Sequence, residues 1–243
     1  MTNNLRNFYS AERVETRADY GSISKTFVSG VFSWMTLGLA ITAFMAYYFA
    51  ANPSLMATLF TADGRMSLLG WVVMLAPLGF VMLMSFRFQK LSSASMQMLF
   101  VVFSVIMGIS LSFIFLAYTS ASIFKTFIVA SGMFGTMAVI GYTTKADLSK
   151  LGSILMMGVI GLVIASVVNM FTHSATFDYI ISFIGVFIFT GLTAYDMQKI
   201  KRIGEGEYGT ENTAKLKIMG ALSLYLDFIN LFLFLLRFLG NRK

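Results

Sequence analysis

Seven long apolar runs dominate the sequence, and each is long enough to cross a lipid bilayer as a helix. The runs cover residues 26–50, 67–86, 92–118, 122–143, 151–171, 178–203 and 216–239. A helix needs about 20 apolar residues to span the hydrocarbon, and lipid tolerates only helices or closed barrels. We therefore predict an all-α polytopic membrane protein with seven transmembrane helices. A six-span arrangement, in which the sixth run is re-entrant, stays open.

The composition agrees with one membrane domain. Of the 243 residues, 57% are hydrophobic and only 12% are charged, which lies outside the range of soluble domains. We expect a seven-helix membrane domain over residues 25–240, preceded by a polar cytoplasmic segment over residues 1–24. The sequence has no cysteine, which excludes disulfides and cysteine-ligated metals.

Lysine and arginine are unevenly distributed between the two ends of the predicted spans. Thirteen lie on the side that holds the N-terminus, and five lie on the other side. Because basic residues accumulate in cytoplasmic loops, the N-terminus is predicted inside and the C-terminus outside. Basic loops that face an anionic leaflet account for most of the net charge of +7. We therefore expect the lipid bilayer, and no nucleic acid, as a partner.

A carboxylate lies deep in the last run. Asp227 comes about 11 residues after the run begins, roughly 16 Å along a helix. A charge at that depth costs about 2.5–3.5 kcal/mol, so it requires a partner or a water-filled cavity. Ser223, Asn230 and Arg237 lie within about 80° of Asp227 around the helix, all to one side of it, and Tyr225 points the opposite way. We predict that this polar stripe faces the bundle interior, with Ser223 and Asn230 lining a pore.

Two further charged residues lie near the predicted inner ends of other spans. Asp196 lies one or two turns before the sixth run ends, and Arg87 closes the second. Since the sixth and seventh spans are antiparallel, Asp196 and Asp227 can meet in the inner half of the membrane. Simpler interpretations stay open: Asp196 pairs with Lys199, Arg87 only reaches for the interface, and Asp227 makes a structural hydrogen bond. Arg237 is expected at the outer interface.

Small residues and polar loops complete the predicted arrangement. Gly161 and Ala165, four residues apart, indicate a close helix contact in the fifth run. Residues 204–215 form the longest internal polar stretch, which we interpret as a connector whose role the sequence does not define.

Two segments carry a resemblance to a known family. AYDMQKIK (194–201) and ALSLYLDFINLFLFLLR (221–237), with seven spans and a short basic second-to-third loop, resemble bacterial members of the Bax inhibitor-1 family, also called the transmembrane Bax inhibitor motif family. The resemblance implies a central seventh helix, a location in the bacterial inner membrane and a pH-sensitive calcium leak. It places the family's aspartate pair on Asp196 and Asp227 and its latching arginine on Arg87. The glutamate that some relatives carry in the second helix is absent here.

A mechanism follows if the two aspartates meet. Two carboxylates in a low dielectric do not both ionise cheaply, so Asp196 and Asp227 should share a proton and act as a pH sensor. When ionised, the pair attracts Arg87 or calcium. With Asn230 and Ser223 it supplies only part of the six to eight oxygens that calcium takes. We therefore expect a weak or transient calcium site, with Ca2+ as a permeant ion and no tightly bound cofactor.

In this hypothesis the ionised pair and Arg87 hold the inner end shut, and protonation releases Arg87. The residues alone leave the direction of pH gating open, because protonation also removes the attraction for calcium.

Other classes of function have less support in the residues. The only histidine, His173, is predicted in an outer loop, and no zinc-protease motif is present, so we expect no enzyme. The main alternative, which the resemblance also suggests, is a modulator without transport activity that binds a quality-control protease or another membrane partner. The physiological ion, the oligomeric state and the identity of any protein partner stay open.

Overall fold

The computed structural model describes residues 2–61, 63–206 and 209–243, with side chains described from Ser24 onward. The helices in this part are α1 (Thr2–Ala51), α2 (Pro53–Thr58), α3 (Leu68–Phe86), α4 (Ser93–Leu111), α5 (Ile114–Ala117), α6 (Ser120–Thr143), α7 (Ser149–Thr172), α8 (Ala175–Gly204) and α9 (Thr210–Leu239). Seven segments of the described chain are helical, long and apolar enough to cross a membrane, which confirms the seven predicted spans. Because α8 is continuous over 30 residues, the sixth span is not re-entrant.

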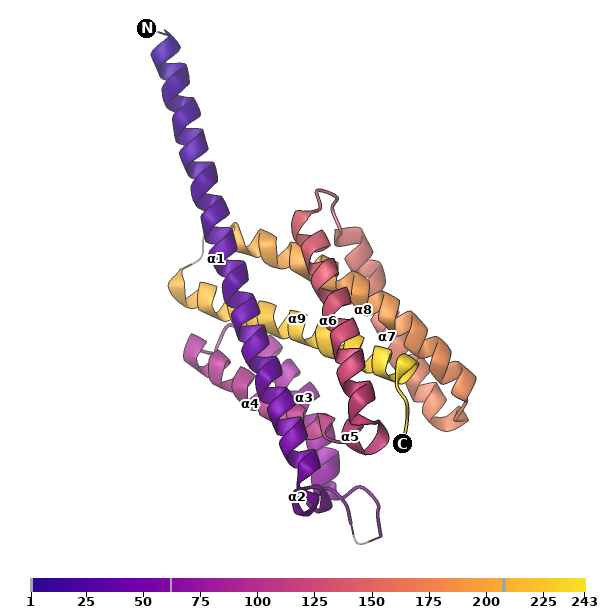
Figure 1. Cartoon of the computed structure of the whole chain (residues 1–243). Helices are drawn as coiled ribbons and strands as arrows, with labels where there is room; N and C mark the ends of the chain where they lie inside the picture. Colours follow the sequence, from indigo (N-terminus) through magenta and orange to yellow (C-terminus); the bar gives the residue numbers. More distant parts are fainter. Residues whose placement is uncertain (1, 62, 207–208) are drawn as a thin grey trace.

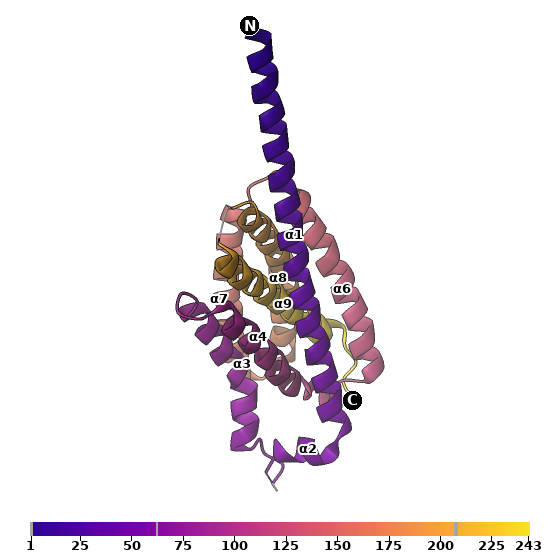
Figure 2. The same cartoon turned by 90° about the vertical axis from the view of Figure 1, so that its left-hand side faces the viewer.

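The last helix occupies the centre of the bundle. About 67% of the apolar window of α9 is buried, against 11–28% for the other six spans. It packs against α1, α4, α6 and α8, while α7 packs on α8 and α3 packs on α4. Figure 1 shows α9 in yellow crossing both α1 and α6, and Figure 2 shows the same helices after a quarter turn. The central seventh helix that the family resemblance implies is therefore present.

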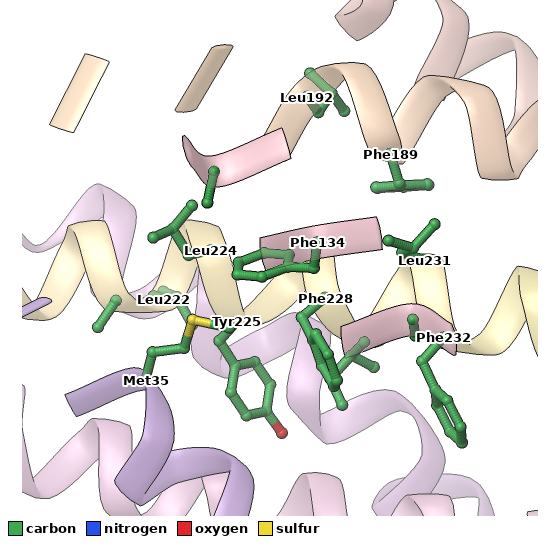
Figure 3. Packing of buried hydrophobic residues seen from close by; sticks show 14 of the residues in the cluster. Met35, Phe134, Phe189, Leu192, Leu222, Leu224, Tyr225, Phe228, Leu231 and Phe232 are labelled. Carbon is green, nitrogen blue, oxygen red and sulfur yellow. The ribbon is translucent and has the colours of Figure 1, made fainter. Parts of the chain in front are cut away.

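The core forms around the apolar side chains of α9. Tyr225 and Leu224 are fully buried, and Phe228 is almost so. Figure 3 shows side chains that leave α9 toward several neighbours, with Leu231 near Phe189 of α8 and Tyr225 near Met35 of α1. A helix that is buried on nearly all sides is apolar on nearly all sides. A charge on such a helix therefore has protein neighbours rather than lipid.

The first helix extends beyond the bundle. α1 begins at Thr2, whereas its apolar span begins at Ser24. Figures 1 and 2 both show the indigo N-terminal half projecting away from the other helices. The polar segment predicted over residues 1–24 therefore continues the first span as a helix over the described residues 2–24.

Side-chain caps fix where several helices begin. Ser67, Ser92, Thr119 and Ser174 precede α3, α4, α6 and α8, and each accepts a hydrogen bond from the backbone N–H three residues on. Such caps satisfy N–H groups that have no partner inside the helix. His173, with φ 48°, ends α7 in the left-handed conformation, and this places it in the loop predicted for it.

The third span agrees with the prediction, since Ser93–Ala117 forms one span in which the short α5 follows α4 after Leu111. Two predicted details were wrong. The connector 204–215 is shorter than predicted, since α9 begins at Thr210.

The second wrong detail concerns the fifth span, where a Cβ on Gly161 would meet nothing within 4 Å. The close contacts there come from Gly152 against Tyr195 and from Gly158 against Ile188.

Candidate functional site

The antiparallel contact between α8 and α9 sets the register of the site. Only the short segment between Gly204 and Thr210 joins the two helices. Gly220 packs near Ile200 at one end, and the rings of Phe189 and Phe234 stack with centroids 5.7 Å apart farther along. This register brings the part of α8 around residue 196 opposite the part of α9 around residues 223–227.

The structure brings Asp196 and Asp227 together. Asp227 is 5% exposed, and its Oδ2 has no hydrogen-bond partner among the described residues. Asp196 is half-buried, lies beside the Ser223 side chain at the cleft and is close enough to Asp227 for the two charges to repel. An unpaired buried carboxylate oxygen is costly in a low dielectric, so it marks a place where a proton, water or cation is needed.

A cleft of about 420 Å³ opens beside Asp196. Asp196 and Lys199 line it from α8, Ser223 lines it from α9, and Phe88 and Gln89 line it from the loop after α3. The cleft lies where α3 and α8 end and where α4 and α9 begin, which is the predicted inner end of the bundle. Asp227 is not part of its lining, so the cleft reaches Asp196 but not the buried carboxylate of Asp227.

The two predicted pore-lining residues differ in their surroundings. Ser223 contacts both Asp196 and the cleft. The Nδ2 of Asn230 donates to the carbonyl of Leu226 on its own helix, 2.8 Å away, and the side chain is half-buried. Asn230 is therefore held by α9 itself and does not line the cleft.

Arg87 lies near the cleft without an ion pair to the aspartates. It caps the C-terminal end of α3, and its side chain is exposed. Within the described residues, the ion pairs join Arg202 to Asp147 and join Arg237 and Arg242 to Asp178. The structure thus places Arg87 next to the cleft-lining Phe88 but not on Asp196 or Asp227, and its latching role stays a prediction.

The donor set is small for a metal. The described residues contain no group of three or more His, Cys, Asp or Glu side chains placed to hold a metal ion. Asp196, Asp227 and Ser223 offer five side-chain oxygens at most, and calcium takes six to eight. Any calcium at this place would have to keep water or backbone ligands, as an ion in passage does.

A buried polar cluster on the other face of α9 was not predicted. Tyr225 is fully buried, and its hydroxyl lies 2.7 Å from the Thr42 hydroxyl of α1. Thr42 donates to the carbonyl of Ser104 on α4 at 2.8 Å, so the Tyr225 hydroxyl must donate to Thr42. The helical periodicity showed that Tyr225 points away from Asp227, but it carried no signal for partners on α1 and α4.

Arg237 has a partner at the end of the bundle opposite the cleft. Its guanidinium lies 3.3 Å from Asp178 in the first turn of α8, and Arg242 lies 3.4 Å from the other oxygen of the same carboxylate. The side-chain hydrogen bond to Tyr118 raises the pKa of Arg242 above its ordinary value. These contacts join the last turn of α9 and the following segment to α8.

The loop between α6 and α7 is tied to α8 near the cleft end. Arg202 lies 2.8 Å from Asp147, and Gln198 bonds the backbone of Ala146 and Leu148. Hydrogen bonds from the Ser149 hydroxyl, which has the larger effect, and from Arg202 lower the pKa of Asp147 to about 2. This exposed carboxylate is therefore ionised at every physiological pH.

The fold and the site define a class: a polytopic α-helical membrane protein with a buried carboxylate on its central helix. The family model described as "Inhibitor of apoptosis-promoting Bax1" matches residues 24–243. The chain is 48% identical over 221 residues to the inner membrane protein YbhL of Escherichia coli, covering 90% of this chain and 93% of that protein. It is also 44% identical over 222 residues to an uncharacterized protein of Borreliella burgdorferi, covering 91% and 94% of the two chains.

The chain belongs to the Bax inhibitor family, as the resemblance predicted, because the family model covers nearly all of it. Its seven spans and its similarity to an inner membrane protein make it a multi-pass protein of the bacterial inner membrane.

Proposed function

We propose that the chain is a pH-sensitive calcium leak of the membrane, in which Asp196 and Asp227 sense protons. The observation that supports this most is the Asp227 carboxylate, which is buried on the central helix with an oxygen that has no described partner. A structural carboxylate would be expected to have both oxygens satisfied. Intramembrane ionisable groups without such a structural role mark ion and proton pathways.

The cleft supports a route from the predicted inner end to the carboxylates. Cations enter the cleft beside Asp196 and meet Asp227 next, where two negative charges attract them in a low dielectric. Protonation of the carboxylates weakens and finally removes that attraction, and it also changes the contacts between α8 and α9. In this proposal the second effect dominates, so acid widens the seam between these helices and increases the leak.

In the proposal Arg87 is the latch. The conformation described above, in which Arg87 does not contact the aspartates, is the one with the latch released. The guanidinium sits at the end of α3, beside two residues that line the cleft. A movement of the α3 end toward α8 would bring it to the ionised pair. Such an ion pair favours the ionised form of the carboxylates, so their protonation favours release of Arg87.

The alternative is a modulator without transport activity that binds a membrane protease or another membrane protein. One feature favours it: the N-terminal half of α1 projects beyond the bundle and offers a surface for a partner (Figures 1 and 2). Neither proposal assigns a catalytic residue or a tightly bound cofactor to the chain.

The test is calcium flux into liposomes that contain the purified protein, measured from pH 5 to 8 for the wild type and for Asp227→Asn. Asparagine keeps the size of the side chain and has no titratable proton, so the ratio of flux at acid and neutral pH should fall to about 1. The control is Asp63→Asn, which changes an exposed loop carboxylate. An unchanged flux and pH profile in Asp227→Asn would remove the sensor role.

A further inference from the structure

A buried lysine lies at the start of α9 with an unusual partner. Lys215 is 5% exposed, and its Nζ donates to the backbone carbonyl of Phe88 at 3.4 Å and lies 5.1 Å from the centre of the Phe88 ring. Within the described residues it forms no ion pair with a carboxylate. Phe88 follows the C-terminal end of α3, where the helix dipole is negative and carbonyl groups lack helical partners.

Glu211, one turn before Lys215 on α9, contacts the beginning of α4. Glu211 accepts hydrogen bonds from the backbone N–H of Ser93 at 2.5 Å and from the Ser93 hydroxyl at 2.8 Å. Ser93 is the first residue of α4, where the dipole is positive. The end of α3 and the start of α4 meet at residues 87–92, which we call the α3–α4 corner. The positive charge of Lys215 thus faces the negative end of α3, and the negative charge of Glu211, four residues earlier on α9, faces the positive end of α4.

The α3–α4 corner is also one wall of the cleft. Phe88 and Gln89 line the cleft, together with the last two residues of α3, Ser85 and Phe86. Among the helices of the described part, α3 packs extensively only on α4. At its other end α3 is joined to α2 through Ser67, whose Oγ lies 3.0 Å from the carbonyl of Thr58. The corner end is therefore the end of α3 that can move away from α8 and α9.

We propose that Lys215 and Glu211 are positioning residues that hold the α3–α4 corner against α9 and so set the width of the cleft beside Asp196. The proposal rests on the proposed function for its effect on calcium flux, but its structural part does not. Loss of the Lys215 charge releases the Phe88 carbonyl, and the end of α3 with its cleft-lining residues then moves outward. Arg87 lies in this corner, so its distance from the carboxylates depends on the same two contacts.

The direct test is the distance across the cleft, measured by electron paramagnetic resonance between spin labels in the full chain in nanodiscs. The chain has no cysteine, so Gln89→Cys and Glu205→Cys supply the only labelling sites. Lys215→Met should increase the population of long distances about tenfold, the factor that corresponds to one lost charge-assisted hydrogen bond. Lys215→Arg should retain the short distance, and Glu211→Gln, at an exposed position, should lengthen it in part.

The matched control is Lys217→Met, because the Lys217 side chain lies against Gly30 of α1 instead. An unchanged distribution in both Lys215→Met and Glu211→Gln, or an equal change in Lys217→Met, would overturn the proposal.

Calcium flux of the same variants separates this proposal from the proposed function. Lys215→Met should raise the leak at pH 8, where the wild type is expected to be closed. A wider cleft in a protein that passes no calcium under any condition would support the positioning role and reject the leak. A changed flux with an unchanged distance would reject the positioning role.

Discussion

Two buried polar side chains on α9 show how burial alone fails to identify a functional residue. Tyr225 and Asp227 are both almost inaccessible, yet Tyr225 has a hydrogen-bond partner and Asp227 Oδ2 has none in the described part. A satisfied buried group contributes to stability and specificity, whereas an unsatisfied one costs free energy. The difference assigns Tyr225 to the structure and Asp227 to the proposed function.

Tyr225→Phe should therefore lower stability and leave the pH profile of the leak unchanged. Loss of the hydroxyl breaks the bond to Thr42 and should reduce the free energy of unfolding by about 1 kcal/mol. Unfolding of the purified protein in mixed micelles with increasing SDS measures this. Tyr47→Phe, at a residue that is 65% exposed, is the control and should have almost no effect. Equal stability of the two variants would show that the Thr42 contact contributes nothing.

The stability that Asp147 contributes should depend on pH, and this contribution should be lost at low pH. Since the folded protein lowers the pKa of Asp147 from 3.8 to about 2, its contribution to stability is complete above pH 3.8 and is lost as the pH falls toward 2. Asp147→Asn should thus lower the thermal midpoint equally from pH 5 to 8 and should not change the pH dependence of flux in that range. A shifted flux profile would mean that the α6–α7 loop, rather than the carboxylate pair, senses protons.

At the level of elements, periodicity and length predicted most of the spans because each helix is long and apolar. The start of α9 was missed, since its first turns carry Glu211 and Lys215, which resemble a polar loop until their partners at the α3–α4 corner are known. Spacing also placed Asp196 and Asp227 on facing helices. It could not show where the Arg87 side chain lies, because that depends on how α3 packs.

Glycine contacts give a test at the same level. Gly141 of α6 packs directly on the backbone of Ala194 in α8, so a Cβ there would collide with main-chain atoms. Gly141→Ala should destabilise the protein by about 1–3 kcal/mol. Gly135→Ala, in the same helix with nothing within 4 Å, should be neutral or slightly stabilising because alanine favours helix. Equal effects in SDS unfolding would contradict the close α6–α8 contact.

At the level of the whole molecule, the two ends of the α8–α9 contact differ. One end is joined by Asp178 with Arg237 and Arg242, while the other holds the cleft and the carboxylates. In the proposed leak, the cleft end opens while these charged contacts hold the opposite end together. The lysine and arginine distribution predicts that the cleft end faces the cytoplasm, and that orientation stays a prediction.

Calcium flux through the purified wild-type protein in liposomes at pH 6 and pH 8, with protein-free liposomes as the reference, tests directly whether the protein is a pH-sensitive leak. We expect a leak above the reference that is larger at pH 6 and whose pH dependence disappears in Asp227→Asn. A flux equal to the reference at both pH values would contradict it and would favour the modulator without transport activity.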